Sequence, residues 1–254
     1  MSENDLSIQH LFSLEGKVAL VTGGSRGIGY MISQGLLQAG ARVYITSRKA
    51  DACAQAAVDL GQYGECIAIP ADVTSPEGLG QLCEQLQQLE PRLHILINNA
   101  GAAWGEAYES YPEAAFDKLM SINVTAVFSL TRALTPLLET TASIEDDPAR
   151  VVNIGSMDGL HIPTVPGVGT YAYTASKAAV HHLTRHLAVE LGGRGITVNA
   201  IAPGFFPSRM TDYVFENRGR EIESNSLLGR AGKAEEMAGI AVYLSGRAGA
   251  YTHG

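Results

Sequence analysis

The 254-residue chain lacks most of the features that mark secreted, membrane-bound or nucleic-acid-binding proteins. Its three cysteines, Cys53, Cys66 and Cys83, are odd in number and lack the spacing of metal ligands, so we expect reduced structural thiols. Basic residues are few, 18 against 26 acidic ones, and the net charge of −8 argues against a nucleic-acid or anionic-membrane surface. No apolar run reaches the length of a membrane span, and residues 1–10 are too polar for a signal peptide. We therefore expect a soluble protein of the cytoplasm that binds neither nucleic acid nor membrane.

The length and the apolar content indicate one large domain. A chain of this size with 46% hydrophobic residues suits a single α/β domain better than two small ones. Residues 1–13 show no clear period and precede the first predicted strand, so we expect a mobile or surface-docked arm there. Residues 14–254 are then expected to form the domain.

A glycine-rich turn within residues 18–29 joins a short apolar strand to a helix. The strand is followed by the sequence TGGSRGIG, after which apolar residues recur at helical spacing. Glycines allow the backbone to approach a pyrophosphate, and a helix start offers unpaired N–H groups and a partial positive charge. The Gly-x-x-x-Gly-x-Gly spacing differs from the Gly-x-Gly-x-x-Gly pattern, and such turns also occur as plain connectors. The strand and helix around the turn favour a dinucleotide site.

The end of the second predicted strand, residues 42–46, indicates which dinucleotide is bound. An acidic side chain at this place would accept hydrogen bonds from an adenosine ribose, whereas arginine accommodates a 2′-phosphate. Here Ser47 replaces the acid and Arg48 follows it, with Arg26 as a second cation in the glycine turn. This pattern predicts NADP(H). The alternative is that Arg48 and Lys49 are only solvated residues before a helix.

Two later motifs give the chain a family resemblance. The sequence NNAG at residues 98–101 ends another apolar strand, and YTASK at residues 173–177 opens a long helix, with Tyr173 and Lys177 one turn apart. Ser156 ends a strong strand 17 positions before Tyr173. With these motifs in this order, the chain resembles the short-chain dehydrogenase/reductase family from about Leu14 to its last residue. The resemblance implies a single-domain α/β Rossmann fold, a doubly wound parallel sheet with helices on both faces, and ligand binding at the carboxyl ends of the strands.

The same resemblance implies four catalytic residues and no metal. Tyr173 would donate a proton to the carbonyl oxygen that a hydride reduces, and Ser156 would hydrogen-bond the same oxygen. Lys177 would hold the nicotinamide ribose, and its positive charge, helped by that of the oxidised nicotinamide, would lower the pKa of Tyr173. Asn123 would hold a water that passes protons to Lys177. From the residues alone, Asn123 is equally explained as a buried amide that joins two helices.

The resemblance also implies where the cofactor lies. Asp72 and the Val73 backbone would recognise adenine, although Asp72 also suits a turn cap before the next helix. The turn after residue 203 would touch the nicotinamide. The full set of expected cofactor contacts is Gly23, Ser25, Arg26, Gly27, Ile28, Gly29, Arg48, Asp72, Val73, Asn99, Ala100, Gly101, Tyr173, Lys177, Pro203, Gly204, Phe206 and Ser208.

Other segments depart from the family pattern or leave alternatives open. The loop 163–170 is longer than in most relatives and should shape the substrate pocket, and residues 212–228 should form a lid over it.

His182, His186 and Glu190 have a spacing that could bind zinc, but a packed or subunit-facing polar stripe explains it better. Relatives end with one more strand, whereas this sequence stops at Gly254 where that strand should begin. We expect a truncated sequence rather than a lost strand.

The substrate and the assembly are inferred from the same resemblance. Residues 148–160, 206–211 and 229–237 look most like the 3-oxoacyl reductases of the rhamnolipid-biosynthesis type, a branch of the β-ketoacyl-(acyl-carrier-protein) reductases of fatty acid biosynthesis. The expected substrate is a 3-oxoacyl thioester on acyl carrier protein or coenzyme A, and helices apolar on more than one side suggest a homodimer or homotetramer. A sugar, polyol or steroid dehydrogenase and a non-catalytic NADP sensor remain alternatives. An apolar cleft for the acyl chain would be lined by Ile162, Val165, Phe205, Phe206, Met210, Tyr213 and Phe215.

Overall fold

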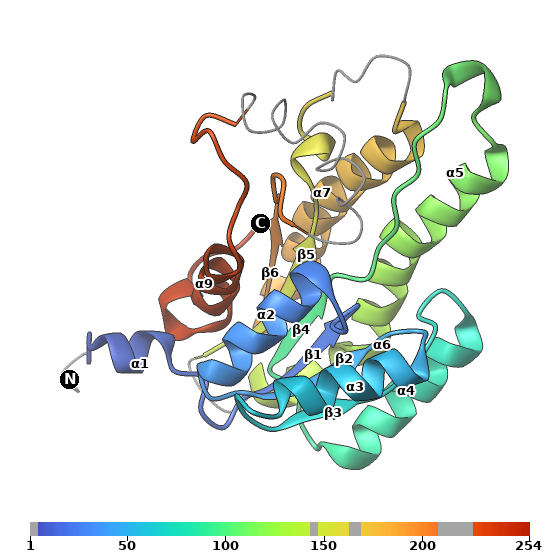
Figure 1. Ribbon diagram of the computed structural model, residues 1–254. Helices are drawn as coiled ribbons and strands as arrows, with labels where there is room; N and C mark the ends of the chain where they lie inside the picture. The colour runs from blue at the N-terminus through green and yellow to red at the C-terminus, as the bar shows by residue number, and fades with distance from the viewer. Residues whose placement is uncertain (1–4, 143–146, 163–168, 208–225) are drawn as a thin grey trace.

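Six parallel strands form one sheet at the centre of the molecule (Figure 1). The computed structural model describes residues 5–142, 147–162, 169–207 and 226–254. The strand order β3-β2-β1-β4-β5-β6 reverses direction between β1 and β4, as in a doubly wound fold. This confirms the predicted fold class. The strands are β1 (Val18–Thr22), β2 (Arg42–Thr46), β3 (Cys66–Ala68), β4 (Ile95–Asn98), β5 (Ala149–Ile154) and β6 (Ile196–Ile201).

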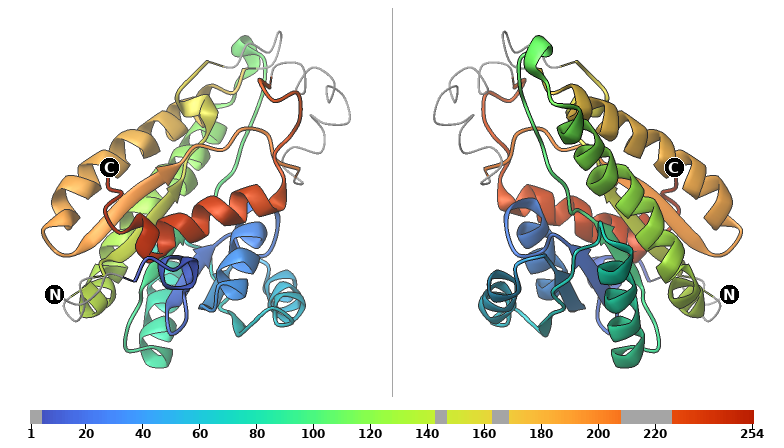
Figure 2. Two further views of the ribbon diagram at one scale, coloured as in Figure 1. Left: turned by 90° about the vertical axis from the view of Figure 1, so that its left-hand side faces the viewer. Right: turned by 90° about the vertical axis from the view of Figure 1, so that its right-hand side faces the viewer.

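Helices cover both faces of the sheet, and Figure 2 shows the two layers from opposite sides. On one face, side chains of α4 (Pro76–Leu89), α6 (Ala126–Ala142) and α7 (Tyr171–Gly192) form one hydrophobic core with the strands. Every residue of β1, β4 and β5 is buried, because parallel strands between two helical layers have no solvent face. On the other face, α2 (Gly27–Gln38), α3 (Ala50–Leu60) and α9 (Ala234–Ser245) form a second hydrophobic core with the strands.

Within the described residues, no helix combines the length and the apolar character needed to cross a membrane.

A π-helical turn divides the helical stretch from Glu113 to Ala142. α5 (Glu113–Met120) and α6 are joined by a π-helix at Ser121–Thr125, which contains the buried Asn123. Such turns occur frequently at functional sites, because they rotate the side chains that follow them. Apolar spacing does not reveal this change from α- to π-helix.

The chain ends both contact the folded domain. Part of the predicted N-terminal arm is a short helix, α1 (Ile8–Phe12), which is capped by Ser7 and packs against α9 and the 3₁₀ turn Arg247–Gly249. At the other end, the Gly254 N–H donates to the Val198 carbonyl of β6 at 3.0 Å. The arm showed no period in the sequence because five residues make little more than one helical turn.

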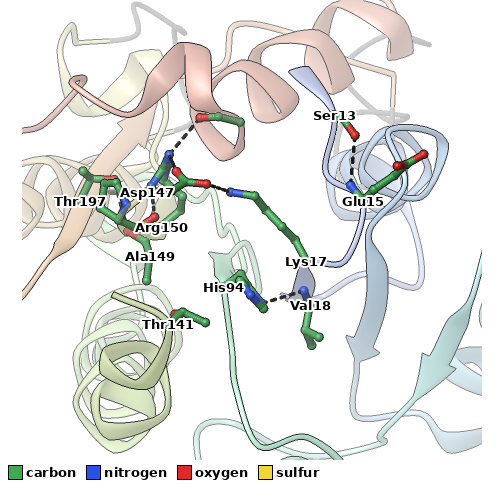
Figure 3. Close-up of polar contacts among 12 residues, drawn as sticks. Ser13, Glu15, Lys17, Val18, His94, Thr141, Asp147, Ala149, Arg150 and Thr197 are labelled. Carbon is green, nitrogen blue, oxygen red and sulfur yellow. Dashed lines mark hydrogen bonds and ion pairs between the residues drawn. The ribbon is translucent and has the colours of Figure 1, made fainter. Parts of the chain in front are cut away.

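A buried ion cluster joins the amino ends of β1 and β5, on the side of the sheet away from the glycine turn (Figure 3). Arg150 is 1% exposed and donates to Asp147 at 2.6 Å and to the Gly246 carbonyl at 3.0 Å. Lys17 reaches the other oxygen of Asp147 at 2.5 Å. Burial acts to raise the pKa of Asp147, but the Lys17 hydrogen bond and the two neighbouring cations hold it below its ordinary value. One carboxylate therefore balances the buried Arg150 and the half-buried Lys17.

We predict that Asp147→Ala lowers the free energy of unfolding by about 3 kcal/mol, because it leaves the buried Arg150 and the half-buried Lys17 without a counter-ion. Urea denaturation at one fixed protein concentration measures this change. The matched control is Glu139→Ala, which breaks the exposed ion pair with Arg194 and should cause a much smaller loss. Equal losses in the two variants would contradict the role of the buried cluster.

Candidate active site

The glycine turn has the shape of an anion-binding loop. Gly23 and Gly27 have positive φ angles of 66° and 54°, which L side chains rarely adopt. α2 begins at Gly27, and no side chain caps its first turn. The first N–H groups of α2 are therefore available to a phosphate, as the helix dipole also favours. Ser25 precedes this helix half-buried, and Ile28 packs against the core below it.

The NNAG segment holds the glycine turn in place. The Thr22 hydroxyl accepts hydrogen bonds from the N–H groups of Asn99 and Ala100, both at 2.9 Å, and Asn99 Nδ2 donates to the Thr22 carbonyl at 2.8 Å. A Cβ added to Gly29 would lie 2.4 Å from Asn99 Nδ2, so a side chain there would break the arrangement. Asn98 points elsewhere and donates to Asn153 Oδ1 at 2.9 Å, which joins β4 to β5. The analysis of the sequence missed the role of Thr22.

The carboxyl end of β2 offers a polar, positively charged surface. Arg48 and Arg26 are both exposed, and the Ser47 hydroxyl is buried without a hydrogen-bond partner. Asp72 Oδ1 accepts from the hydroxyl and the N–H of Thr74 at 2.6 and 2.9 Å, so the turn-cap interpretation of Asp72 is confirmed. The Thr74 hydrogen bonds and the charge of Arg48 hold the pKa of Asp72 below its ordinary value. The two exposed cations fit the phosphorylated ribose of NADP(H).

Lys177 and Asn123 lie together at the end of β4. Lys177 is buried, and its Nζ donates to the Ile154 carbonyl at 2.7 Å and lies 5.7 Å from the ring centroid of Tyr173. Asn123 accepts from the Ala102 N–H at 3.0 Å and donates to Ser176 Oγ at 2.9 Å. Asn123 therefore joins the π-turn to α7, which supports its interpretation as a buried connecting amide. A Cβ on Gly101 would lie 3.0 Å from Asn123 Oδ1 and 3.8 Å from Lys177 Nζ, so both side chains meet there.

Ser156 lies close enough to Tyr173 to lower its pKa, although 17 positions separate them in the sequence. Ser156 directly follows the turn at the end of β5 and is 7% exposed. Its Oγ accepts the Asp158 N–H at 3.1 Å, and this leaves the hydroxyl proton free to point into the site. The structure thus brings together all four predicted catalytic side chains at the carboxyl ends of β4 and β5.

The predicted lowering of the Tyr173 pKa by Lys177 is wrong for the protein alone. Burial raises the pKa of Tyr173 above its ordinary value, and the hydrogen bond from Ser156 only partly opposes this. Burial also lowers the pKa of Lys177 to about 8. The physical reason is that both groups are out of water, which favours the neutral form of each, while the lysine head group bonds a backbone carbonyl.

The structure adds two titratable residues that the motifs did not reveal. Burial raises the pKa of the Asp158 carboxyl, which lies close enough to raise the pKa of Tyr173 as well. His181 is buried beneath Ser156, with Nε2 3.0 Å from the Ser156 carbonyl oxygen. Its position four residues after Lys177 places it on the same face of α7, and this spacing could have identified it.

Several other predicted residues have different surroundings or lie outside the described residues. The Pro203 carbonyl accepts the Met157 N–H at 3.0 Å, while Gly204 is exposed. The ring of Phe206 packs against Gly232, where an added Cβ would lie 2.4 Å from it. No group of three potential metal ligands occurs in the part of the chain that the structure describes. Val165, Ser208, Met210, Tyr213, Phe215 and most of the predicted lid lie outside that part.

The motifs and their geometry agree with a comparison to known families. A family profile described as short chain dehydrogenase matches residues 17–219. The chain belongs to the short-chain dehydrogenase family. This confirms the resemblance found in the sequence, and as a short-chain dehydrogenase the protein is an oxidoreductase.

Individual members of the short-chain dehydrogenase family are similar along nearly the whole chain. The rhamnolipids biosynthesis 3-oxoacyl-(acyl-carrier-protein) reductase of Pseudomonas aeruginosa is 54% identical over 245 residues, which cover 96% of this chain and 94% of the relative. The 5-keto-D-gluconate 5-reductase of Escherichia coli is 33% identical over 248 residues, covering 96% and 94%. A solved structure described as the Pseudomonas aeruginosa RhlG/NADP active-site complex has a TM-score of 0.92 at 52% identity and covers 96% of this chain and 94% of its own.

We predict that Tyr173→Phe lowers turnover of a reducible carbonyl at least ~10²-fold, because the variant keeps the ring and lacks the proton donor. Steady-state oxidation of NADPH measures turnover, and cofactor fluorescence measures binding, which should change little. Tyr171→Phe is the matched control, since Tyr171 packs edge-on against Tyr108 and Tyr111 and should tolerate the loss of its hydroxyl. Near-normal turnover of Tyr173→Phe would contradict the assigned role.

Proposed function

We propose that this short-chain dehydrogenase uses NADPH to reduce the 3-oxo group of an acyl thioester, carried on acyl carrier protein or coenzyme A, to a 3-hydroxy group. The observation that carries the proposal is the meeting of Ser156, Tyr173 and Lys177 beside the glycine turn. The 54% identity to a rhamnolipids biosynthesis 3-oxoacyl-(acyl-carrier-protein) reductase supports the choice of substrate, and the proposal includes a place in fatty acid biosynthesis.

Each of the four catalytic side chains has its own role in the reduction of the carbonyl group. Bound NADPH would supply a hydride to the carbonyl carbon, which would leave negative charge on the substrate oxygen. Tyr173 donates its proton to that oxygen, while the Ser156 hydroxyl hydrogen-bonds it. The raised pKa of Tyr173 keeps the phenol protonated at neutral pH, which is the form that reduction requires. Lys177 and Asn123 hold the site together and are placed to return a proton to Tyr173.

The cofactor preference follows from the surface after β2. Arg48 and Arg26 are exposed cations, and the unpaired Ser47 hydroxyl lies in the loop between β2 and α3. A guanidinium binds a phosphate by paired hydrogen bonds, whereas no acidic side chain stands at the end of β2 to hold a free ribose hydroxyl. These features support NADP(H) over NAD(H), and the RhlG/NADP complex of a similar chain agrees with this choice.

We predict that Arg48→Ala weakens the binding of NADPH at least ~10-fold more than that of NADH, because only NADPH carries the 2′-phosphate. Titration of cofactor fluorescence gives both dissociation constants. Lys49→Ala is the matched control, since it removes the neighbouring exposed cation and should affect both cofactors slightly. Equal weakening of NADPH and NADH by Arg48→Ala would show that this residue is structural.

Apolar side chains near the site favour an acyl chain over a sugar. Ile162 is 90% exposed, and Leu160 and Leu228 are also exposed large apolar residues. An apolar surface of this kind buries hydrocarbon, whereas a polyol requires several hydrogen-bonding side chains. The sugar alternative has support of its own, because the 5-keto-D-gluconate 5-reductase is 33% identical. A non-catalytic sensor is less favoured because all four catalytic side chains are retained.

We predict faster NADPH-dependent reduction of 3-oxodecanoyl thioester than of acetoacetyl thioester, and slow or no reduction of a gluconate-type keto sugar. The measured quantity is kcat/KM for each compound at one pH. A higher kcat/KM for the keto sugar would overturn the substrate while leaving the reductase assignment intact. Failure to reduce any carbonyl compound would instead favour the sensor alternative.

The protein is also proposed to act as a homodimer or homotetramer in the cytoplasm. Exposed apolar residues on α5, α6 and α7 support self-association, namely Phe116, Phe128 and Val189. Arg132 covers part of the Phe128 ring, with its guanidinium carbon 5.5 Å from the ring centroid. The three cysteines are free thiols, as a reducing compartment requires.

A further inference from the structure

A histidine lies directly under the catalytic serine. His181 is 8% exposed, and its Nε2 lies 3.0 Å from the carbonyl oxygen of Ser156 and 3.4 Å from the Ser156 nitrogen. When Nε2 carries a proton, it donates to the carbonyl. When Nε2 is unprotonated, it accepts from the N–H. Either tautomer therefore binds the Ser156 backbone, although only one of the two bonds forms at a time.

The chain around Ser156 is shaped to accept this imidazole ring. A Cβ added to Gly155 would lie 2.3 Å from His181 Cε1, and one added to Gly159 would lie 2.8 Å from His181 Cδ2. Gly155 therefore makes room for the ring, whereas Gly159 also lies against the α7 backbone, where its added Cβ would be 2.6 Å from the Lys177 carbonyl carbon. An apolar side chain at position 181 would fill the same space without a hydrogen bond.

Backbone hydrogen bonds hold the other residues of the turn 155–159, called the serine turn below. The Gly155 N–H donates to the Ile201 carbonyl at 2.8 Å, and the Met157 N–H donates to the Pro203 carbonyl at 3.0 Å. These bonds tie the turn to β6 and the residues after it. The Gly159 N–H reaches the Ser156 carbonyl at 3.1 Å, but that bond lies within the turn itself. His181 thus links Ser156 directly to α7, the helix that also carries Tyr173 and Lys177.

We propose that His181 is a positioning residue that sets the orientation of Ser156 relative to Tyr173. The proposal rests on the proposed reductase function. The Ser156 hydroxyl must hydrogen-bond both Tyr173 and the substrate oxygen, and a displacement of about 1 Å at such a site lowers turnover by up to ~10²-fold. Among the described residues, His181 makes no hydrogen bond or ion pair with the glycine turn or with the cations after β2. Its loss should therefore affect kcat and leave cofactor binding unchanged.

The experiment compares His181→Leu, His181→Gln and Thr184→Val. Leucine removes the hydrogen bond, whereas glutamine can place an amide nitrogen or oxygen near the Ser156 backbone. Thr184 is the matched control, because it is buried one turn further along α7 and bonds Asn153, away from Ser156. We expect a fall in kcat of roughly 10-fold or more for His181→Leu, partial recovery in His181→Gln, and near-normal kcat for Thr184→Val. The dissociation constant for NADPH should stay within about twofold in all three variants, as expected for a group that does not touch the cofactor.

A second measurement does not depend on turnover. Amide hydrogen exchange of residues 155–159 should be faster in His181→Leu than in the wild type and unchanged in Thr184→Val. Unchanged exchange and kcat in His181→Leu would overturn the proposal. Equal loss of kcat in His181→Leu and Thr184→Val would show that general destabilisation is the cause, which also overturns it. A wild type without reductase activity would refute the proposed function, and hydrogen exchange would still test the positioning of Ser156.

Discussion

The hydrogen bond from the Lys177 ammonium to the Ile154 carbonyl is the interaction on which the active site depends. It joins α7 to the end of β5 at 2.7 Å, and it lies in the protein interior, where such a charged donor is strong. Tyr173 stands one turn before Lys177, and Ser156 stands two residues after Ile154. The bond therefore fixes the distance between two catalytic groups that come from separate elements. The burial that strengthens it also lowers the pKa of Lys177 to about 8.

Each half of the site is held by polar contacts behind the groups that face the ligands. In the cofactor half, Thr22 and Asn99 fix the glycine turn through backbone N–H and carbonyl groups. In the catalytic half, Asn123 joins the π-turn to Ser176, and His181 holds the Ser156 backbone. These side chains are buried or half-buried, so their hydrogen bonds offset the desolvation that an unpaired polar group would suffer. These contacts restrain the catalytic and glycine-turn backbone, and electrostatic catalysis depends on such fixed groups.

The raised pKa of Tyr173 bears on the direction of the reaction. A phenol that stays protonated is ready to donate, and donation completes the reduction of a carbonyl. Oxidation of an alcohol requires the phenolate, which burial makes costly in the protein alone. The positive charge of an oxidised nicotinamide would stabilise that phenolate. An oxidised cofactor would therefore favour the phenolate form of Tyr173, whereas the protein alone favours the phenol.

The sequence by itself determined the order of the elements and the residues at the strand ends. The strand at 42–46 was predicted with its observed bounds, because a β-branched and apolar run bounded by glycine or polar residues is a local signal. The motifs around Gly23, Asn99 and Tyr173 also predicted which side chains meet, since the carboxyl ends of parallel strands share one edge of the sheet. The assignment of individual cofactor contacts stays a prediction.

Only the tertiary structure decided the π-turn at Asn123, the docking of α1 and the place of His181 beneath Ser156. It also reversed the expected pKa shift of Tyr173. The reason is physical: a spacing rule shows that Lys177 and Tyr173 share a helix face, but not how far each is removed from water. Desolvation depends on every element packed around a group, and these elements come from distant parts of the chain. Burial, and with it the protonation state of the site, is therefore a property of the folded molecule.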